Sequence, residues 1–253
     1  MSRVELGPPF TFHITVGTLV LMKVVADVGV NFRNLLHMRS EMVLAPQETE
    51  AGVEYRLHAR LADIAILRGD RVVLVTESRL TDPQGRRILG YRDFFVILNL
   101  EPEQVEALRA SKGFGNFDIS ELRDAARRRS KLLPKSGVQR KSVTVADDMG
   151  VRYGRVAGDL NPVHTTAMAA RLFGYKRPFV QGLCTANYLL VALTSALPVP
   201  LQQFRITFSQ PVFTGQPFDI LFTDRAFEVL DEQSAVLAHG QFDRVAAHGT
   251  DPG

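Results

Sequence analysis

Short segments rich in apolar residues recur along much of the first hundred residues, as they do in chains that form β-strands. Segments with this pattern are 36–44, 55–67, 72–80 and 88–98. Asp82-Pro83-Gln84-Gly85, between the last two, is typical of a hairpin turn. The stretch before them, 16–28, is apolar at most positions and predicts a buried helix. This order indicates a sheet of about four strands that wraps one helix.

The last hundred residues repeat the order of a helix followed by strands. Leucines at helical spacing predict a long helix from Gly182 to Leu197, which Pro198 stops. Strand candidates follow at 204–208, 218–222 and 235–242. The repeated order predicts an α+β fold in which two helix-and-sheet units share one continuous sheet across a pseudo-twofold axis.

Two shorter helices are predicted ahead of the long one. Thr144, with Asp147 three residues later, is a capping pattern for a helix that runs toward Arg155. A second helix is predicted from Thr166 to Phe173, with Gly174 placed to end it. Between these two helices lies the loop that carries the most distinctive residues of the chain.

The residues between the two units are polar and rich in charge. A short helix is predicted over 101–110 and a charged one over 120–133, which Pro134 breaks. The basic run 127–131 admits two interpretations, a site for a cofactor phosphate or a solvated helix face, and charge runs are more often surface. We therefore expect three parts, an N-terminal unit over 1–100, a helical, basic connector over 101–140 and a C-terminal unit over 141–253.

Composition narrows the classes of protein. The 253 residues are 45% apolar and 23% charged, as in ordinary globular proteins, and the net charge of +3 is only mildly basic. No aromatic-rich basic motif favours nucleic acid. The single Cys184 excludes an intramolecular disulfide, and the apolar run 14–30 is interrupted by Lys23 and Asp27. With no signal-peptide pattern at the start, we expect a soluble, cytoplasmic protein without a membrane partner.

The candidate chemistry lies in the loop before the long helix. Asp159 and His164 stand on either side of Asn161-Pro162, a pair that favours a turn. Gly182 then opens a helix whose first amides have no partner inside the helix. An acid–base pair beside free backbone donors is suited to chemistry on a carbonyl compound. The other histidines show no metal-ligand spacing, and no phosphate-binding loop appears, so no metal or cofactor is expected.

These residues resemble the MaoC-like family of (R)-specific enoyl-CoA hydratases, the hydratase 2 enzymes, which have hot-dog folds. The segments that carry the resemblance are Tyr153, 157–164 and 174–182. Ala157 stands where the family has serine, and Gln181 stands where it has histidine. The duplicated layout resembles the double hot-dog members, and only the C-terminal unit has the catalytic motif.

The resemblance implies a hydratase or dehydratase that interconverts 2-enoyl and 3-hydroxyacyl thioesters. Asp159 and His164 are then the catalytic residues that hold one water, and the Gly182 amide stabilises the thioester oxygen. Candidates for substrate binding are Tyr153, Asn161, Gln181, Lys176 and Arg177. Tyr153 is equally well a core aromatic, and Asn161 is better suited to fixing the loop. The expected partner is an acyl-CoA or acyl-carrier-protein thioester, coenzyme A enters as part of the substrate, and a homodimer is the assembly to consider.

Two other functions remain open at this stage. A non-catalytic acyl-thioester-binding protein, or a partner subunit, is consistent with Gln181 and with the unequipped first unit. A hot-dog acyl-CoA thioesterase would use the same helix amide with a different water. Hydration of an enoyl thioester and release of a free thiol distinguish these functions.

Overall fold

The computed structural model describes residues 26–27, 35–44, 53–68, 71–110, 130–133, 136–197 and 201–244. The apolar helix predicted over 16–28 lies outside these residues, except that Ala26 and Asp27 are helical. The predicted charged helix over 120–133 also lies outside them, apart from its last four residues. No helix within the described ranges is long and apolar enough to cross a membrane.

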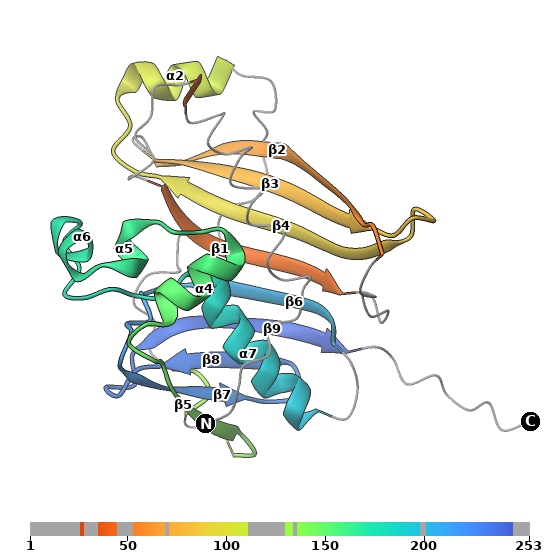
Figure 1. Cartoon of the computed structure of the whole chain (residues 1–253), viewed down its shortest axis with the longest axis vertical. Coiled ribbons are helices and arrows are strands. Elements are labelled where there is room, and N and C mark those ends of the chain that lie inside the picture. The colour runs from red at the N-terminus through yellow and green to blue at the C-terminus, as the bar shows by residue number, and fades with distance from the viewer. Residues whose placement is uncertain are drawn as a thin grey trace, which may run out of the picture.

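The described strands form one antiparallel sheet of nine strands, in the order β2-β3-β4-β1-β6-β9-β8-β7-β5 (Figure 1). The strands of the first half are β1 (Leu35–Leu44), β2 (Arg56–Arg68), β3 (Arg71–Thr81) and β4 (Arg87–Ile97). Those of the second half are β5 (Gln139–Thr144), β6 (Leu201–Phe208), β7 (Pro217–Phe222), β8 (Ala226–Leu230) and β9 (Val236–Arg244). The four strands predicted in the first half are thus confirmed.

The two halves of the sheet meet where β1 pairs with β6. Their antiparallel register runs from Arg39 opposite Thr207 to Val43 opposite Gln203. Backbone hydrogen bonds therefore continue from one half to the other, which confirms the predicted continuous sheet.

Five helices are described: α2 (Pro102–Ala110), α4 (Met149–Ala157), α5 (Pro162–Thr165), α6 (Ala167–Leu172) and α7 (Gly182–Ala196). Figure 1 shows α7 lying across the second half of the sheet, with α4 beside its N-terminal end. Most side chains of α7 are buried, as expected for a helix that is apolar on nearly all sides. The largest buried cluster joins α7 residues such as Leu189 to Phe204 of β6 and to Tyr91 of β4. Strands of both halves thus contribute to the core around α7.

The start of the C-terminal unit differs from the prediction. Residues Gln139–Thr144 form strand β5, and the helix begins only at Met149, after an N-cap at Asp148 rather than Thr144. The reason is long-range pairing, because β5 runs antiparallel to β7 and Ser142 Oγ donates to Asp219 Oδ1 over 2.5 Å. A local capping pattern was outweighed by a strand partner about 75 residues away in the sequence.

Strand β8 was missed because a charged residue interrupts its apolar pattern. Glu228 is buried in the middle of β8. Its carboxylate accepts hydrogen bonds from Ser130 Oγ at 2.5 Å and from the amide of Lys131 at 2.9 Å. Residues 130–133 therefore form a turn around this carboxylate, so the predicted helix does not extend to Leu133. The predicted connector also ends slightly earlier than expected, because β5 begins at Gln139.

Candidate active site

The loop that carries the candidate pair is held by its own side chains. Helix α4 ends at Gly158, whose φ of 74° is left-handed. Asp159 Oδ1 accepts from the Asn161 amide at 3.2 Å, and Asn161 Oδ1 accepts from the Val163 amide at 3.3 Å. Asn161 thus fixes the loop, the alternative expected for it. The Asn161-Pro162 pair is more than a turn, because Pro162 is the first residue of helix α5, where a missing N–H costs nothing.

The two candidate catalytic side chains face each other. His164 Nδ1 donates to the Phe179 carbonyl at 2.9 Å, which leaves Nε2 of the neutral ring as the acceptor. That Nε2 lies 3.9 Å from Asp159 Oδ2. This distance is too long for a direct hydrogen bond, but one water at about 2.8 Å from each atom fits between them. Both side chains keep some exposure, 12% for His164 and 30% for Asp159.

The electrostatics of the pair favour a neutral imidazole. Burial is the largest influence and lowers the pKa of His164 below its ordinary value. The charge of Asp159 and the hydrogen bond to Phe179 act in the opposite direction without cancelling it. His164 is therefore uncharged at neutral pH, as a group that accepts a proton from water must be.

Helix α4 supports this loop through two glycines that the sequence analysis did not single out. A Cβ on Gly150 would lie 1.9 Å from the carbonyl oxygen of His164, and one on Gly154 would lie 2.5 Å from that of Asp159. The helix backbone therefore lies directly against the backbone of both candidate residues. The available signal was the spacing of the two glycines, four residues apart on one helix face.

Gln181 supports the same loop from the other side. Its Nε2 donates to the Asp159 carbonyl at 2.9 Å and to the Gly150 carbonyl at 3.1 Å. The side chain is buried, and its Oε1 has no hydrogen-bond partner within the described part of the chain. These contacts favour a role in holding the loop over the direct substrate contact that we predicted for Gln181.

Gly182 is the first residue of α7, and its amide belongs to the unpaired group at the start of a helix. It is partly exposed. A Cβ at this position would lie 3.0 Å from the ring of Phe208, so β6 closes over the helix start. A side chain here would require the Phe208 ring to shift, and the N–H of Gly182 has no partner inside the helix.

Tyr153 lies in the core beside the site. It has no exposed surface, and none of the residues that the structure describes forms a hydrogen bond with its hydroxyl. Burial raises the pKa of Tyr153, and the charges of Asp159 and Asp93 add to that effect. The core alternative for Tyr153 is thus favoured. Cys184 is buried one turn into α7, and burial raises the pKa of its thiol, so it is not a reactive nucleophile.

The two predicted cations of the site stand at the surface after α6. Lys176 is exposed and its Nζ lies 4.6 Å from the centre of the Phe213 ring. Arg177 is exposed and donates to the Thr214 carbonyl at 3.1 Å. Both side chains thus contact the segment that precedes β7. Across the described ranges, no cluster of three or more metal-ligating side chains is found.

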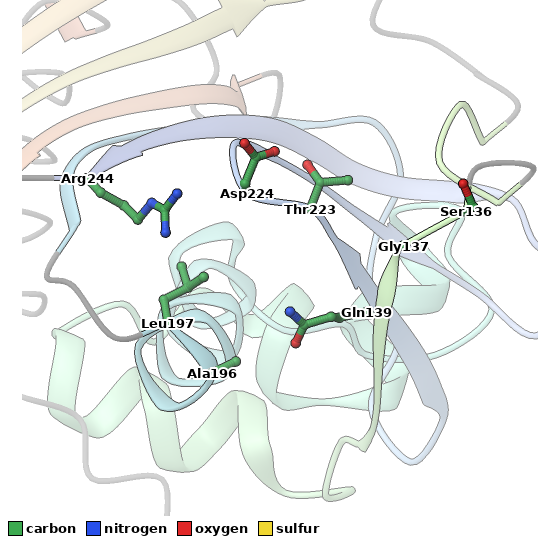
Figure 2. Close-up of a pocket in the computed structure, with 8 residues that line it drawn as sticks. All are labelled: Ser136, Gly137, Gln139, Ala196, Leu197, Thr223, Asp224 and Arg244. Carbon is green, nitrogen blue, oxygen red and sulfur yellow. The ribbon is translucent and has the colours of Figure 1, made fainter.

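A polar cavity of about 500 Å³ lies elsewhere, at the C-terminal end of α7 (Figure 2). It is lined by Leu197, by Gln139 of β5, by Asp224 after β7 and by Arg244. None of the predicted site residues lines it. The cavity is therefore separate from the Asp159–His164 pair, which lies near the opposite end of α7.

Solved structures with the same architecture define the fold class of this protein. HtdX of Mycobacterium tuberculosis superimposes with a TM-score of 0.64 at 14% identity, covering 93% of this chain and 87% of that one. Another protein of the same organism, whose structure has a double hot-dog fold, gives a TM-score of 0.58 at 11% identity, covering 95% and 82%. At such identities the likeness concerns the fold alone. The chain has a hot-dog fold of the double type, as the sequence predicted.

The sequence comparisons point to one family. Residues 131–240 match the family described as the MaoC like domain. Peroxisomal multifunctional enzyme type 2 of Drosophila melanogaster is 26% identical over 81% of this chain and 34% of its own length. Enoyl-CoA hydratase ChsH3 of Mycobacterium tuberculosis is 26% identical over 74% of this chain and 57% of its own length. The chain thus spans about a third of the first relative.

Proposed function

We propose that this protein is an (R)-specific hydratase/dehydratase that interconverts 2-enoyl and 3-hydroxyacyl thioesters, with acyl-CoA as the first substrate to test. The observation that carries the proposal is the 3.9 Å gap between His164 Nε2 and Asp159 Oδ2, two partly exposed groups placed to share one water. The MaoC-like domain and the relative named as an enoyl-CoA hydratase support the reaction class. The stereochemistry follows from the resemblance to hydratase 2 enzymes.

In the proposed reaction, the water held by the pair supplies both new substituents. Its oxygen bonds to C3 of the enoyl group, and one of its protons ends on C2 from the same face. Asp159 and the neutral His164 relay that proton together. The Gly182 amide, at the positive end of α7, stabilises the charge that builds on the thioester oxygen. Lys176 and Arg177, both exposed, are proposed to contact the phosphates of coenzyme A.

The purified protein is expected to hydrate crotonyl-CoA, which is measured as loss of the enoyl absorbance. A stereospecific dehydrogenase then identifies the 3-hydroxybutyryl-CoA that forms, with the 3R product expected. Free-thiol release from butyryl-CoA is measured in parallel. Thiol release without hydration would favour a thioesterase, and binding of butyryl-CoA without either reaction would favour a non-catalytic binder. Either result would overturn the proposal.

Activity is expected to persist below the pH at which an ordinary histidine becomes charged. Burial lowers the pKa of His164, so the neutral form that can accept a proton remains populated below pH ~6.5. The acid limb of kcat/KM for crotonyl-CoA should therefore fall below ~6.5. The profile is measured from pH 5 to 8, with thermal unfolding at each pH to exclude loss of the fold. An acid limb above ~6.5 would contradict this account of His164.

A further inference from the structure

A second histidine–carboxylate pair lies on the first half of the sheet, in strands that carry none of the predicted site residues. His37 of β1 places its Nε2 3.1 Å from Asp93 Oδ1 of β4 and 3.2 Å from Ser40 Oγ. Ser40 Oγ also donates to Asp93 Oδ1. Ser40 and Asp93 are buried, whereas the His37 side chain is 18% exposed. Ser40 and Asp93 are thus a buried polar pair that holds one partly exposed imidazole.

This group is not built for nucleophilic catalysis, although it contains serine, histidine and aspartate. In a catalytic triad the two ring nitrogens have separate partners, one the carboxylate and the other the serine. Here the same Nε2 faces both Ser40 and Asp93. The Ser40 hydroxyl has 0% exposure, so no substrate reaches it. The arrangement instead fixes the orientation of the His37 ring and places its proton on Nε2.

The other ring nitrogen of His37 is the functional atom of this arrangement. In the tautomer whose Nε2–H is directed at Asp93, Nδ1 is the hydrogen-bond acceptor of the ring. Among the described residues, Nδ1 has no hydrogen-bond partner. A hydrogen-bond acceptor on a ring that is held in place and partly exposed is suited to recognising an N–H or O–H of a ligand.

A line of contacts joins His37 to the proposed oxyanion donor. The His37 ring stacks on Phe95 at 4.5 Å and meets Phe208 at 5.1 Å between ring centres. The Phe208 ring lies 3.0 Å from the position a Cβ would take on Gly182. His37, Phe95, Phe208 and Gly182 are all partly exposed. These contacts connect the start of α7 to β1 and β4 in the first half of the sheet.

We propose that His37 Nδ1 accepts a hydrogen bond from an N–H or O–H of the bound thioester, so that the first half of the sheet takes part in substrate recognition. The donor is either an amide N–H of the pantetheine arm or a hydroxyl on the acyl chain. The inference rests on the proposed function in taking the ligand to be an acyl thioester. Asp93 and Ser40 are positioning residues that act through His37.

The two donors are distinguished with matched crotonyl thioesters. S-ethyl thiocrotonate has no N–H, whereas the N-acetylcysteamine thioester carries the first amide of the pantetheine arm. The acyl donor is tested with 2-pentenoyl and 5-hydroxy-2-pentenoyl groups on the same thiol. Wild-type kcat/KM should favour one donor-bearing member of these pairs by about tenfold, the effect of one hydrogen bond. No preference in either pair would overturn the proposal without any variant.

Two variants then locate the effect at His37. His37→Gln places an amide donor near the position of Nε2, which keeps the bond to Asp93 and removes Nδ1. It should abolish the preference, because kcat/KM for the thioester with the donor should fall about tenfold more than kcat/KM for the thioester without it. His37→Asn places a carboxamide near Nδ1 and should retain more of the preference. Equal losses on all thioesters with His37→Gln would show a purely structural role. His58→Gln, on an exposed residue of β2, is the control.

Binding separates this inference from the proposed function. The Kd of butyryl-N-acetylcysteamine and of S-ethyl thiobutyrate is measured by calorimetry, because neither undergoes hydration. If no enoyl thioester is hydrated but His37→Gln still removes a tenfold binding preference, the proposed function fails and the recognition site stands. If hydration occurs and no binding preference depends on His37, the reverse holds.

Discussion

Asp159→Asn and His164→Gln are each expected to lower kcat for crotonyl-CoA hydration by about 10²–10⁴, the range for removing a positioned acid–base group. The physical reason is that the two side chains, 3.9 Å apart, act on the same water. Because the two residues act as a unit, the effects of the two substitutions should not multiply. The kcat of the double variant should lie within a few-fold of the kcat of the slower single variant. The measurement is kcat by loss of the enoyl absorbance, with thermal unfolding to verify the fold.

Asp148→Asn is the matched control for those variants. Asp148 is an exposed aspartate at the N-cap of α4, its side chain makes no capping hydrogen bond, and its ion pair with Arg152 is 3.8 Å long. Exposed pairs of this kind contribute little to stability, so kcat should stay near the wild-type value. A shared water would be contradicted if the effects of Asp159→Asn and His164→Gln multiplied in the double variant. It would also be contradicted if either single variant retained more than half of the wild-type activity.

Gly150→Ala is expected to lower kcat by about 10²-fold and to destabilise the protein by about 1–3 kcal/mol. The added Cβ would lie 1.9 Å from the His164 carbonyl oxygen, so α4 and the catalytic loop must move apart. Because the contact is with backbone, no side-chain rotation relieves it. Such a displacement also disturbs the Gly150 carbonyl that accepts from Gln181. Thermal unfolding and kcat are measured together.

Gly90→Ala separates this steric effect from a general intolerance of alanine. Gly90 lies in β4, and a Cβ there would meet its nearest neighbours at 3.7 and 3.9 Å, which is ordinary contact. The stability and the kcat of the Gly90→Ala variant should therefore remain close to those of the wild type. If Gly150→Ala behaved like Gly90→Ala, the close approach of α4 to the loop would not be what places His164.

Long-range sheet partners explain most of what the sequence left undetermined in the fold. The long helix and the strands with clear alternation were predictable, because their patterns are local. Strand β5 depends on β7, and β8 contains Glu228, whose carboxylate accepts hydrogen bonds from residues of the connector. From the sequence alone, a buried carboxylate is taken for a surface residue, because its hydrogen-bond donors lie far away in the sequence. For that reason the two missed strands lie where tertiary contacts outweigh local preference.

The candidate site likewise contains features that local sequence patterns indicate and features that depend on distant contacts. Asp159, His164 and Gly182 could be singled out as candidates because a loop, a proline and a helix start lie close together in a short stretch of chain. Gln181 was recognised as a departure from the family pattern, but its hydrogen bond to the Asp159 carbonyl required coordinates. The same is true of His37, which lies more than a hundred residues before the motif and reaches the site surface only through the pairing of β1 with β6.

The continuous sheet leaves two terminal strands, and their composition bears on self-association. Among the described strands, β2 and β5 each pair on one side only. Exposed cations stand on both, with Arg56 and Arg60 on β2 and Arg140 and Lys141 on β5. Arg60 pairs with Glu77 and Arg140 pairs with Asp219 on the neighbouring strands. Charged side chains on a terminal strand disfavour its pairing with a strand of another chain, so these two strands are poor sites for end-to-end extension of the sheet.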